Sequence, residues 1–229
     1  MRALALALLA APAGAQDTDL ELVLLADASG SISAAELAFQ RDSYAAAITD
    51  PRVVESIADT AYGSIAVTYV EWAFGQGVVV PWTRIATLDH ARGFAAALDG
   101  PPRGASGGNA IGSALLFGRD LIEGNAIDSW RRVIDFSGDT IGNSYGPPIE
   151  AARDEVVAAG ITINALAITA EGASPGLPAL YQSRIIGGNG AFVVEAAATE
   201  AFAEAIVRKL VLEIAGTPPD GPEVAAARP

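Results

Sequence analysis

Short apolar runs alternate with amphipathic segments along most of the chain. The apolar runs are rich in Val, Ile and Leu, whereas the segments between them repeat apolar residues at helical spacing. Strands are predicted at 20–27, 64–73, 77–85, 131–139, 161–169 and 191–196. Helices are predicted at 34–48, 88–98, 110–122, 148–159, 178–184 and 199–215. This alternation is typical of an α/β protein with a mainly parallel sheet.

One pair of strands interrupts the alternation. The runs at 64–73 and 77–85 are separated by Phe74-Gly75-Gln76, a link too short for a crossover, so they are predicted to form an antiparallel hairpin. Pro81 lies in the second run, and proline is tolerated mainly in an edge strand. The predicted fold is a doubly wound, Rossmann-like sheet with one antiparallel edge strand and helices on both faces.

The helix at 34–48 has the clearest boundaries. Ser33 and Glu36 have the spacing of a capping box, which favours a helix that begins at residue 34. Asp50 and Pro51 follow the apolar pattern and are predicted to stop the helix.

The two ends of the chain differ from the part between them. Residues 1–15 contain an arginine, a short apolar run and the small residues Ala13, Gly14 and Ala15, a pattern that predicts a signal peptide. No later segment has the roughly 20 uninterrupted apolar residues that a membrane helix needs. Residues 16–215 are predicted to form one domain in a periplasmic or secreted protein, and the proline-rich tail at 216–229 is predicted to be disordered.

Composition excludes several kinds of function. The 229 residues contain no cysteine, so a disulfide framework, a thiolate metal site and a cysteine nucleophile are all ruled out. The formal net charge of −13 disfavours binding to nucleic acid or to anionic lipid, since both require basic clusters. A partner that supplies a cation or a basic patch fits this chain better.

Small oxygen-bearing side chains follow the first predicted strand. Asp27, Ser29 and Ser31 alternate along the sequence ADASGS, and Gly30 relieves backbone crowding between them. Ligands bind beyond the carboxyl ends of the strands in such sheets. Oxygen ligands suit Mg²⁺, Mn²⁺ or Ca²⁺, with Mg²⁺ favoured. Alternatively, these side chains satisfy only local backbone groups in a turn before the helix.

The sequence DASGSIS resembles the Asp-x-Ser-x-Ser element of von Willebrand factor type A (vWA) domains. In that family these three side chains form a metal-ion-dependent adhesion site (MIDAS), which a threonine from a later loop and an aspartate after the fourth strand complete. The resemblance assigns these two positions to Asn109, in SGGNAIG, and to Asp139, in DFSGD. Asn109 departs from the family's threonine; it could donate its carbonyl oxygen to a metal or cap the helix at Ala110. Asp139 could instead cap the turn that follows it.

The resemblance extends over about 20–215. Within that range VTYVEW, VVVPWTRI and RRVIDFSGD are similar to a narrower group of exported bacterial proteins, the domain-of-unknown-function family 1194. This similarity implies the fold but names no partner.

Catalytic interpretations find little support in the sequence. A phosphoryl-accepting Asp27 would need a second aspartate two residues later, where Ser29 stands. No Gly-x-Ser-x-Gly nucleophile elbow and no phosphate-binding loop are present, and the single histidine, His90, is expected on a helix surface. A metal-dependent hydrolase would need a base beside Asp27. We therefore predict that the chain is not an enzyme.

The predicted function is that of an exported binding module. A divalent cation held by Asp27, Ser29, Ser31, Asp139 and Asn109 would keep one coordination position open for a carboxylate of a protein partner. The alternative is a metal-independent periplasmic assembly or scaffold subunit with a degenerate metal site.

One further acid is predicted to be structural. Asp135 lies in the middle of a predicted strand, where a buried carboxylate needs a cationic partner such as Arg131, Arg132 or another basic residue.

Overall fold

The computed structural model describes residues 18–100, 105–169, 172–196, 199–217 and 223–225. The strands are β1 (Thr18–Asp27), β2 (Ile65–Trp72), β3 (Gln76–Ile85), β4 (Ser129–Gly138), β5 (Thr162–Ile168), β6 (Val193–Ala196) and β7 (Glu223–Ala225). The helices are α1 (Ala34–Ile48), α2 (Pro51–Ala58), α3 (Leu88–Leu98), α4 (Ile111–Glu123), α5 (Ile149–Ala158), α6 (Leu177–Arg184) and α7 (Thr199–Ala215).

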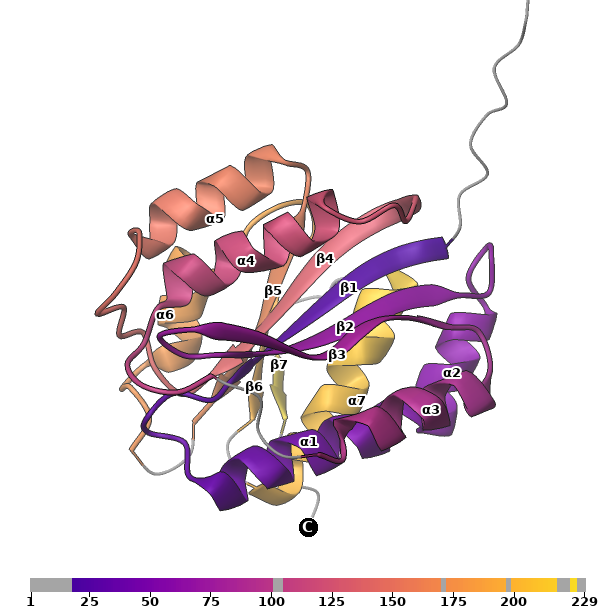
Figure 1. The fold of residues 1–229 in the computed structure, drawn as a ribbon, viewed down its shortest axis with the longest axis horizontal. Helices are drawn as coiled ribbons and strands as arrows, with labels where there is room; N and C mark the ends of the chain where they lie inside the picture. The colour runs from indigo at the N-terminus through magenta and orange to yellow at the C-terminus, as the bar shows by residue number, and fades with distance from the viewer. Residues whose placement is uncertain (1–17, 101–104, 170–171, 197–198, 218–222, 226–229) are drawn as a thin grey trace, which may run out of the picture.

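The strands form one sheet in the order β3-β2-β1-β4-β5-β6-β7. Strand β3 runs antiparallel to β2, and the other neighbours are parallel. Helices α1, α2, α3 and α7 cover one face, and α4, α5 and α6 cover the other (Figure 1). The prediction of a doubly wound, mainly parallel sheet with an antiparallel strand at one edge is confirmed.

The order of the strands determines where a binding site can form. From β1 the chain moves to β2 and β3 on one side, and then returns to β4 on the other side of β1. The carboxyl ends of β1 and β4 therefore flank the switch point of the sheet, where ligands bind in folds of this class. The carboxyl ends of β1 and β4 point to the left in Figure 1. Asp27 is the last residue of β1, and Asp139 directly follows β4.

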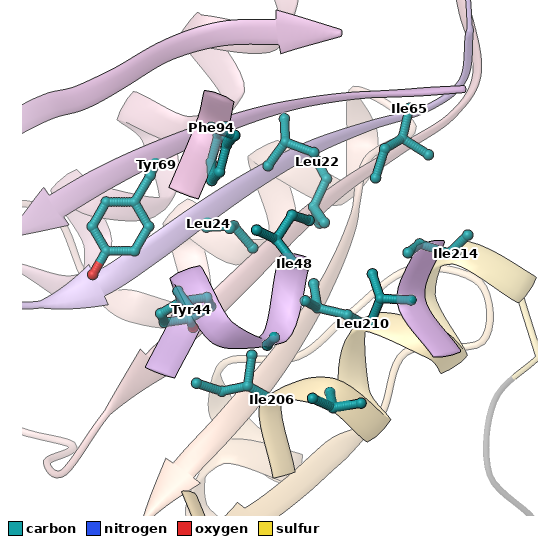
Figure 2. Packing of buried hydrophobic residues seen from close by; sticks show 14 of the residues in the cluster. Leu22, Leu24, Tyr44, Ile48, Ile65, Tyr69, Phe94, Ile206, Leu210 and Ile214 are labelled. Carbon is teal, nitrogen blue, oxygen red and sulfur yellow. The ribbon is translucent and has the colours of Figure 1, made fainter. Parts of the chain in front are cut away.

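Strand β1 lies at the centre of the core and is buried along its full length. Leu22 and Leu24 pack toward α1, α3 and α7, as Figure 2 shows, whereas Val23 and Leu25 pack toward α4 and α5. Alternate side chains point to opposite faces of a strand, so both faces of β1 must be apolar. This burial explains the continuous apolar run that precedes Asp27.

The start of α1 agrees with the prediction, but the interpretation of Asp50 and Pro51 was incomplete. Ser33 and Glu36 form both hydrogen bonds of the capping box. Helix α1 ends at Ile48, but Pro51 then begins α2, because Asp50 accepts a hydrogen bond from the backbone N–H of Arg52. Proline at the first position of a helix loses no intrahelical bond.

The tail also departs from the prediction in one place. Glu223–Ala225 form β7, which pairs in parallel with β6, so the prediction of disorder is wrong for these three residues. The predicted signal peptide at 1–15 lies outside the described residues. No helix within the described ranges is long and apolar enough to cross a membrane.

Candidate functional site

The five predicted ligand residues come from three segments at the carboxyl ends of the strands. Asp27 ends β1, Ser29 and Ser31 lie in the loop before α1, Asn109 precedes α4, and Asp139 directly follows β4. The hydroxyl oxygens of Ser29 and Ser31 are 3.2 Å apart, and Ser31 donates to Asp139 Oδ1 at 3.4 Å. We call these five residues the oxygen cluster.

Local contacts hold the loop that follows β1. The backbone N–H of Ser29 donates to Asp27 Oδ1 at 2.8 Å, and the side-chain amide of Gln40 donates to the Asp27 carbonyl at 3.1 Å. Gly30 donates its N–H to the carbonyl of Gly107 at 2.8 Å, which joins this loop to the segment that carries Asn109. These contacts hold the backbone of the loop from Asp27 to Gly30 in place.

The carboxyl group of Asp27 is fully buried. Burial raises its pKa to about 7, because the charged form loses its hydration, while hydrogen bonds from Ser29 oppose this effect and the negative charge of Asp139 adds to it. Asp27 Oδ2 has no hydrogen-bond partner among the described residues. Burying a charged carboxylate oxygen that has neither hydration nor a hydrogen-bond partner costs free energy, and a cation bound to that oxygen would offset this cost.

Asp139 is half-buried at the end of β4. Burial raises its pKa above the usual range, and the hydrogen bond from Ser31 partly opposes the shift. Its backbone carbonyl accepts from Ser174 at 3.0 Å, and the Tyr181 hydroxyl donates to the carbonyl of Thr140 at 2.9 Å. Residues before and within α6 therefore position this acid, a contribution that the sequence analysis missed.

The side chain of Asn109 does not cap α4. Helix α4 begins at Ile111 with Ala110 as its N-cap, and no side chain of the cap residue forms a hydrogen bond. Asn143 from the loop after β4 accepts from the N–H of Gly112 at 3.2 Å instead. The capping alternative for Asn109 is therefore wrong.

Asn109 resembles Asp27 in one respect. Its Oδ1 is also buried without a hydrogen-bond partner among the described residues. Its backbone carbonyl accepts from Ser144 at 2.9 Å and from Tyr145 at 3.2 Å, so the residue is anchored through its main chain while its side-chain oxygen is left unpaired.

The donor set determines which ligand the cluster can hold. It comprises two carboxylates, two hydroxyls and one amide. Among the described residues, neither this cluster nor any other place brings together three or more His, Cys, Asp or Glu side chains that could hold a metal ion. Hard oxygen donors suit Mg²⁺, Mn²⁺ or Ca²⁺. The two unpaired oxygens, Asp27 Oδ2 and Asn109 Oδ1, are the groups that such a cation would satisfy.

Solved structures with the same fold include proteins of several kinds. The mussel byssus proximal thread matrix protein 1 with a zinc-occupied MIDAS motif matches with a TM-score of 0.63 at 16% identity, over 87% of this chain and 49% of that chain. The pilus adhesin SpaC from Lactobacillus rhamnosus GG matches with a TM-score of 0.61 at 13% identity, over 86% of this chain and 31% of that one. A von Willebrand factor type A protein from Catenulispora acidiphila matches with a TM-score of 0.59 at 17% identity, over 86% of this chain and 43% of that one.

This chain therefore spans less than half the length of each of these three structures, and the low identities establish the fold alone. A search of the curated proteins finds no match. The sequence profile of the family described as "Protein of unknown function (DUF1194)" matches residues 17–218. The chain thus belongs to the DUF1194 family and has the fold of a von Willebrand factor type A domain.

Proposed function

We propose that this protein is an exported binding module whose oxygen cluster holds a divalent cation, with Mg²⁺ favoured. Asp27, Ser29, Ser31, Asp139 and Asn109 would hold the ion, directly or through water. When bound, the cation supplies a positive charge that attracts a carboxylate of a protein partner.

The observation that carries this proposal is the unpaired Oδ2 of Asp27. The groups that shift the pKa of this acid are Ser29 and Asp139, neither of which is a cation. A fully buried acid of this kind is expected to have a cationic partner, and the serine hydroxyls beside it are suitable additional ligands. Asn109 Oδ1 is a second unsatisfied oxygen in the same cluster.

The structural relatives support the same class of function. Their names describe an adhesin and a matrix protein, and one of them has zinc at its MIDAS motif. For export, the support is the signal-peptide pattern at 1–15. Against catalysis, the only histidine is engaged elsewhere, since His90 Nδ1 accepts from the N–H of Ala86 beside α3.

Isothermal titration tests the proposed metal site. Mg²⁺, Mn²⁺ and Ca²⁺ are titrated into chelator-treated protein without residues 1–15, with Zn²⁺ added as a fourth ion because the byssus protein holds it. Saturable binding is expected in the native sequence and its loss in Asp27→Ala. Asp89→Ala is the matched control, since Asp89 is an exposed acid in α3 and its removal changes the net charge equally. If none of the four ions binds, the metal-site proposal is refuted.

The alternative is a metal-independent assembly subunit. Asn109, which stands where the vWA family has threonine, is the residue that favours it. A pull-down from a periplasmic extract, performed with Mg²⁺ and with a chelator, separates the two functions. A partner retained equally under both conditions would support the assembly subunit; a partner lost with the chelator and with Asp27→Ala would support the metal-dependent module.

A further inference from the structure

Two exposed aromatic side chains lie beside the oxygen cluster. Phe74, in the turn between β2 and β3, is 60% exposed, and Tyr145, in the loop after β4, is 49% exposed. Their rings meet edge to face, with centroids 4.9 Å apart and an interplanar angle of 83°. We call these two residues the aromatic pair. Large apolar side chains exposed next to each other often mark an interaction site.

The backbone connects the aromatic pair directly to the oxygen cluster. The N–H of Tyr145 donates to the carbonyl of Asn109 at 3.2 Å, and the carbonyl of Gly107 accepts from Gly30 in the loop that carries Ser29 and Ser31. The segment 107–109 therefore lies between the two features. In Figure 1 the β2–β3 turn and the loop after β4 come together at this same edge of the sheet.

The glycines of this segment allow the aromatic rings to pack closely against it. A Cβ atom at position 108 would lie 2.5 Å from Cε2 of Tyr145, and one at position 107 would lie 3.3 Å from Cβ of Phe74. Gly107 also has a φ of +99°, which disfavours other residues. The sequence Gly107-Gly108 thus holds the aromatic pair against the backbone. A surface fixed before binding loses less conformational entropy when a partner docks.

The electrostatics of this edge limit the chemistry of the partner. The chain carries a formal net charge of −13, and the oxygen cluster itself contains the carboxylates of Asp27 and Asp139. A divalent cation would neutralise the charge of the two carboxylates in the cluster and would attract one acidic group of a partner. The rest of the binding energy must then come from uncharged contacts beside the cation, and the exposed aromatic rings can provide such contacts.

We propose that the aromatic pair forms the apolar half of the partner-binding surface. The partner is a protein segment in which an aspartate or glutamate lies beside a bulky aliphatic side chain. The acid completes the coordination of the cation, and the aliphatic group packs on Phe74 and Tyr145. This inference rests on the proposed metal-dependent function and adds the chemistry of the segment that the site recognises.

A phage-displayed library of random peptides tests the inference. The library is selected on Mg²⁺-loaded protein and eluted with a chelator, and enriched sequences are made as labelled synthetic peptides for fluorescence anisotropy. Affinities are compared between the native sequence and Phe74→Ser/Tyr145→Ser. A second variant, Phe74→Leu/Tyr145→Leu, keeps the apolar character without the rings. Metal affinity is measured by calorimetry in every protein.

The chain offers a matched control at the opposite edge of the sheet. Tyr62 and Trp130 are 45% and 59% exposed, and their rings also meet edge to face, 5.3 Å apart. They lie near the amino ends of β2 and β4, far along the strands from the oxygen cluster. The variant Tyr62→Ser/Trp130→Ser therefore removes a similar pair of exposed aromatic rings at a site remote from the oxygen cluster.

The expected result is an enrichment of peptides with an acid next to a leucine-like residue. The serine variant should bind them about tenfold or more weakly, which is the effect of losing about 1.4 kcal/mol. Its metal affinity should be unchanged, and the control and leucine variants should retain most of the peptide binding. If the metal does not bind the native protein, the proposed function itself fails. Three outcomes would overturn the inference about the aromatic pair although the metal binds. No peptide is enriched, or the native protein and the serine variant bind the peptides with equal affinity, or the enriched peptides carry arginine in place of the aliphatic residue.

Discussion

Two buried aspartates in neighbouring strands have opposite surroundings. Asp27 in β1 and Asp135 in β4 are both almost completely inaccessible to solvent. Asp135 Oδ1 lies 2.7 Å from Nζ of Lys209, the only lysine in the sequence. Asp27, in contrast, has no cationic partner among the described residues, and the groups that shift its pKa are Ser29 and Asp139. The protein supplies its own cation to Asp135 and none to Asp27, which supports the proposed cation site at Asp27.

The surroundings of Lys209 show what a structural acid requires. Nζ of Lys209 also lies 2.5 Å from Glu213 Oε1, which accepts a further hydrogen bond from the side chain of Asn164 at 2.9 Å. We call Lys209, Asp135 and Glu213 the lysine cluster; it joins α7 to the sheet. Buried Glu71 is likewise paired, with Arg41 at 2.6 Å. Asp27 differs from these three acids because no described cation pairs with it, which supports the proposal that it binds a ligand.

The prediction that Asp135 pairs with a cation is confirmed, although the partner is Lys209. Arg131 and Arg132, which the sequence suggested, donate to backbone carbonyls instead, at Glu213 and at Ala159, both at 2.5 Å. These carbonyls lie near the carboxyl ends of α7 and α5, where unpaired carbonyl groups are common.

The largest effect is expected from Lys209→Met. This substitution leaves Asp135 and Glu213 buried without their shared cation, and breaking a buried ion pair in this way destabilises a protein by about 3–5 kcal/mol. Urea unfolding of the native sequence and the variant measures the difference. Arg92→Met removes an exposed ion pair with Asp89 and should change stability by less than about 1 kcal/mol. A loss of similar size in both variants would contradict the structural role of the lysine cluster.

The second effect is a fall in stability as the pH rises. Burial, then the charge of Asp135, raise the pKa of Glu213 from 4.5 to about 7, while Lys209 and Asn164 oppose the shift. Between these two values the folded state holds a proton that the unfolded state has lost, so the free energy of unfolding decreases as pH increases, by up to roughly 3 kcal/mol.

Urea unfolding at about pH 5 and about pH 8 measures this dependence, and Glu213→Gln should reduce it. The difference in pH dependence between the two proteins reports on Glu213, because the other groups with raised pKa values are present in both. These groups are Asp27, Asp139 and the buried Tyr44, whose pKa the charges of Asp135 and Glu213 also raise. An equal pH dependence in the two proteins would show that Glu213 is ionised at neutral pH in the folded state.

Asp27→Asn is expected to act in the opposite direction from Lys209→Met. Above about pH 7 the folded protein must ionise Asp27 despite its burial, which lowers stability. Asparagine keeps the acceptor for the Ser29 N–H and removes the charge, so metal-free protein should gain about 1–2 kcal/mol at about pH 8. Mg²⁺ should then stabilise only the native sequence. A loss of stability, as expected for Asp135→Asn, would mean that Asp27 is structural as well.

The smallest effect is expected at Asn109. Since its Oδ1 makes no hydrogen bond among the described residues, Asn109→Ala should leave the free energy of unfolding within about 0.5 kcal/mol of the native value. Metal affinity should fall about tenfold, and Asn109→Thr should restore it. Asn143→Ala is the contrasting variant: it removes the acceptor at the start of α4 and should cost about 1 kcal/mol in stability without changing metal affinity. Unchanged metal affinity in Asn109→Ala would remove Asn109 from the site.

The sequence by itself determined the parts of this protein that depend on residues close together in the chain. The capping box of Ser33 and Glu36, the hairpin around Phe74 and the alternation of strands and helices all depend on such spacing. The Asp27-to-Ser31 loop belongs to the same class, since its first hydrogen bonds link residues two apart. Helix α2 was missed because Asp-Pro can end one helix and begin another, and β7 because three residues carry no pattern of their own.

Only the tertiary structure decided the contacts between segments that are distant in the sequence. Whether Asn109 caps α4 depends on Asn143, which takes over that role from another loop. Whether Asp135 pairs with an arginine or with Lys209 depends on how α7 packs against the sheet. The aromatic pair exists because the β2–β3 turn and the loop after β4 meet at one edge. Such contacts are set by the order of the strands and the packing of the helices over them, which bring together side chains that no local pattern relates.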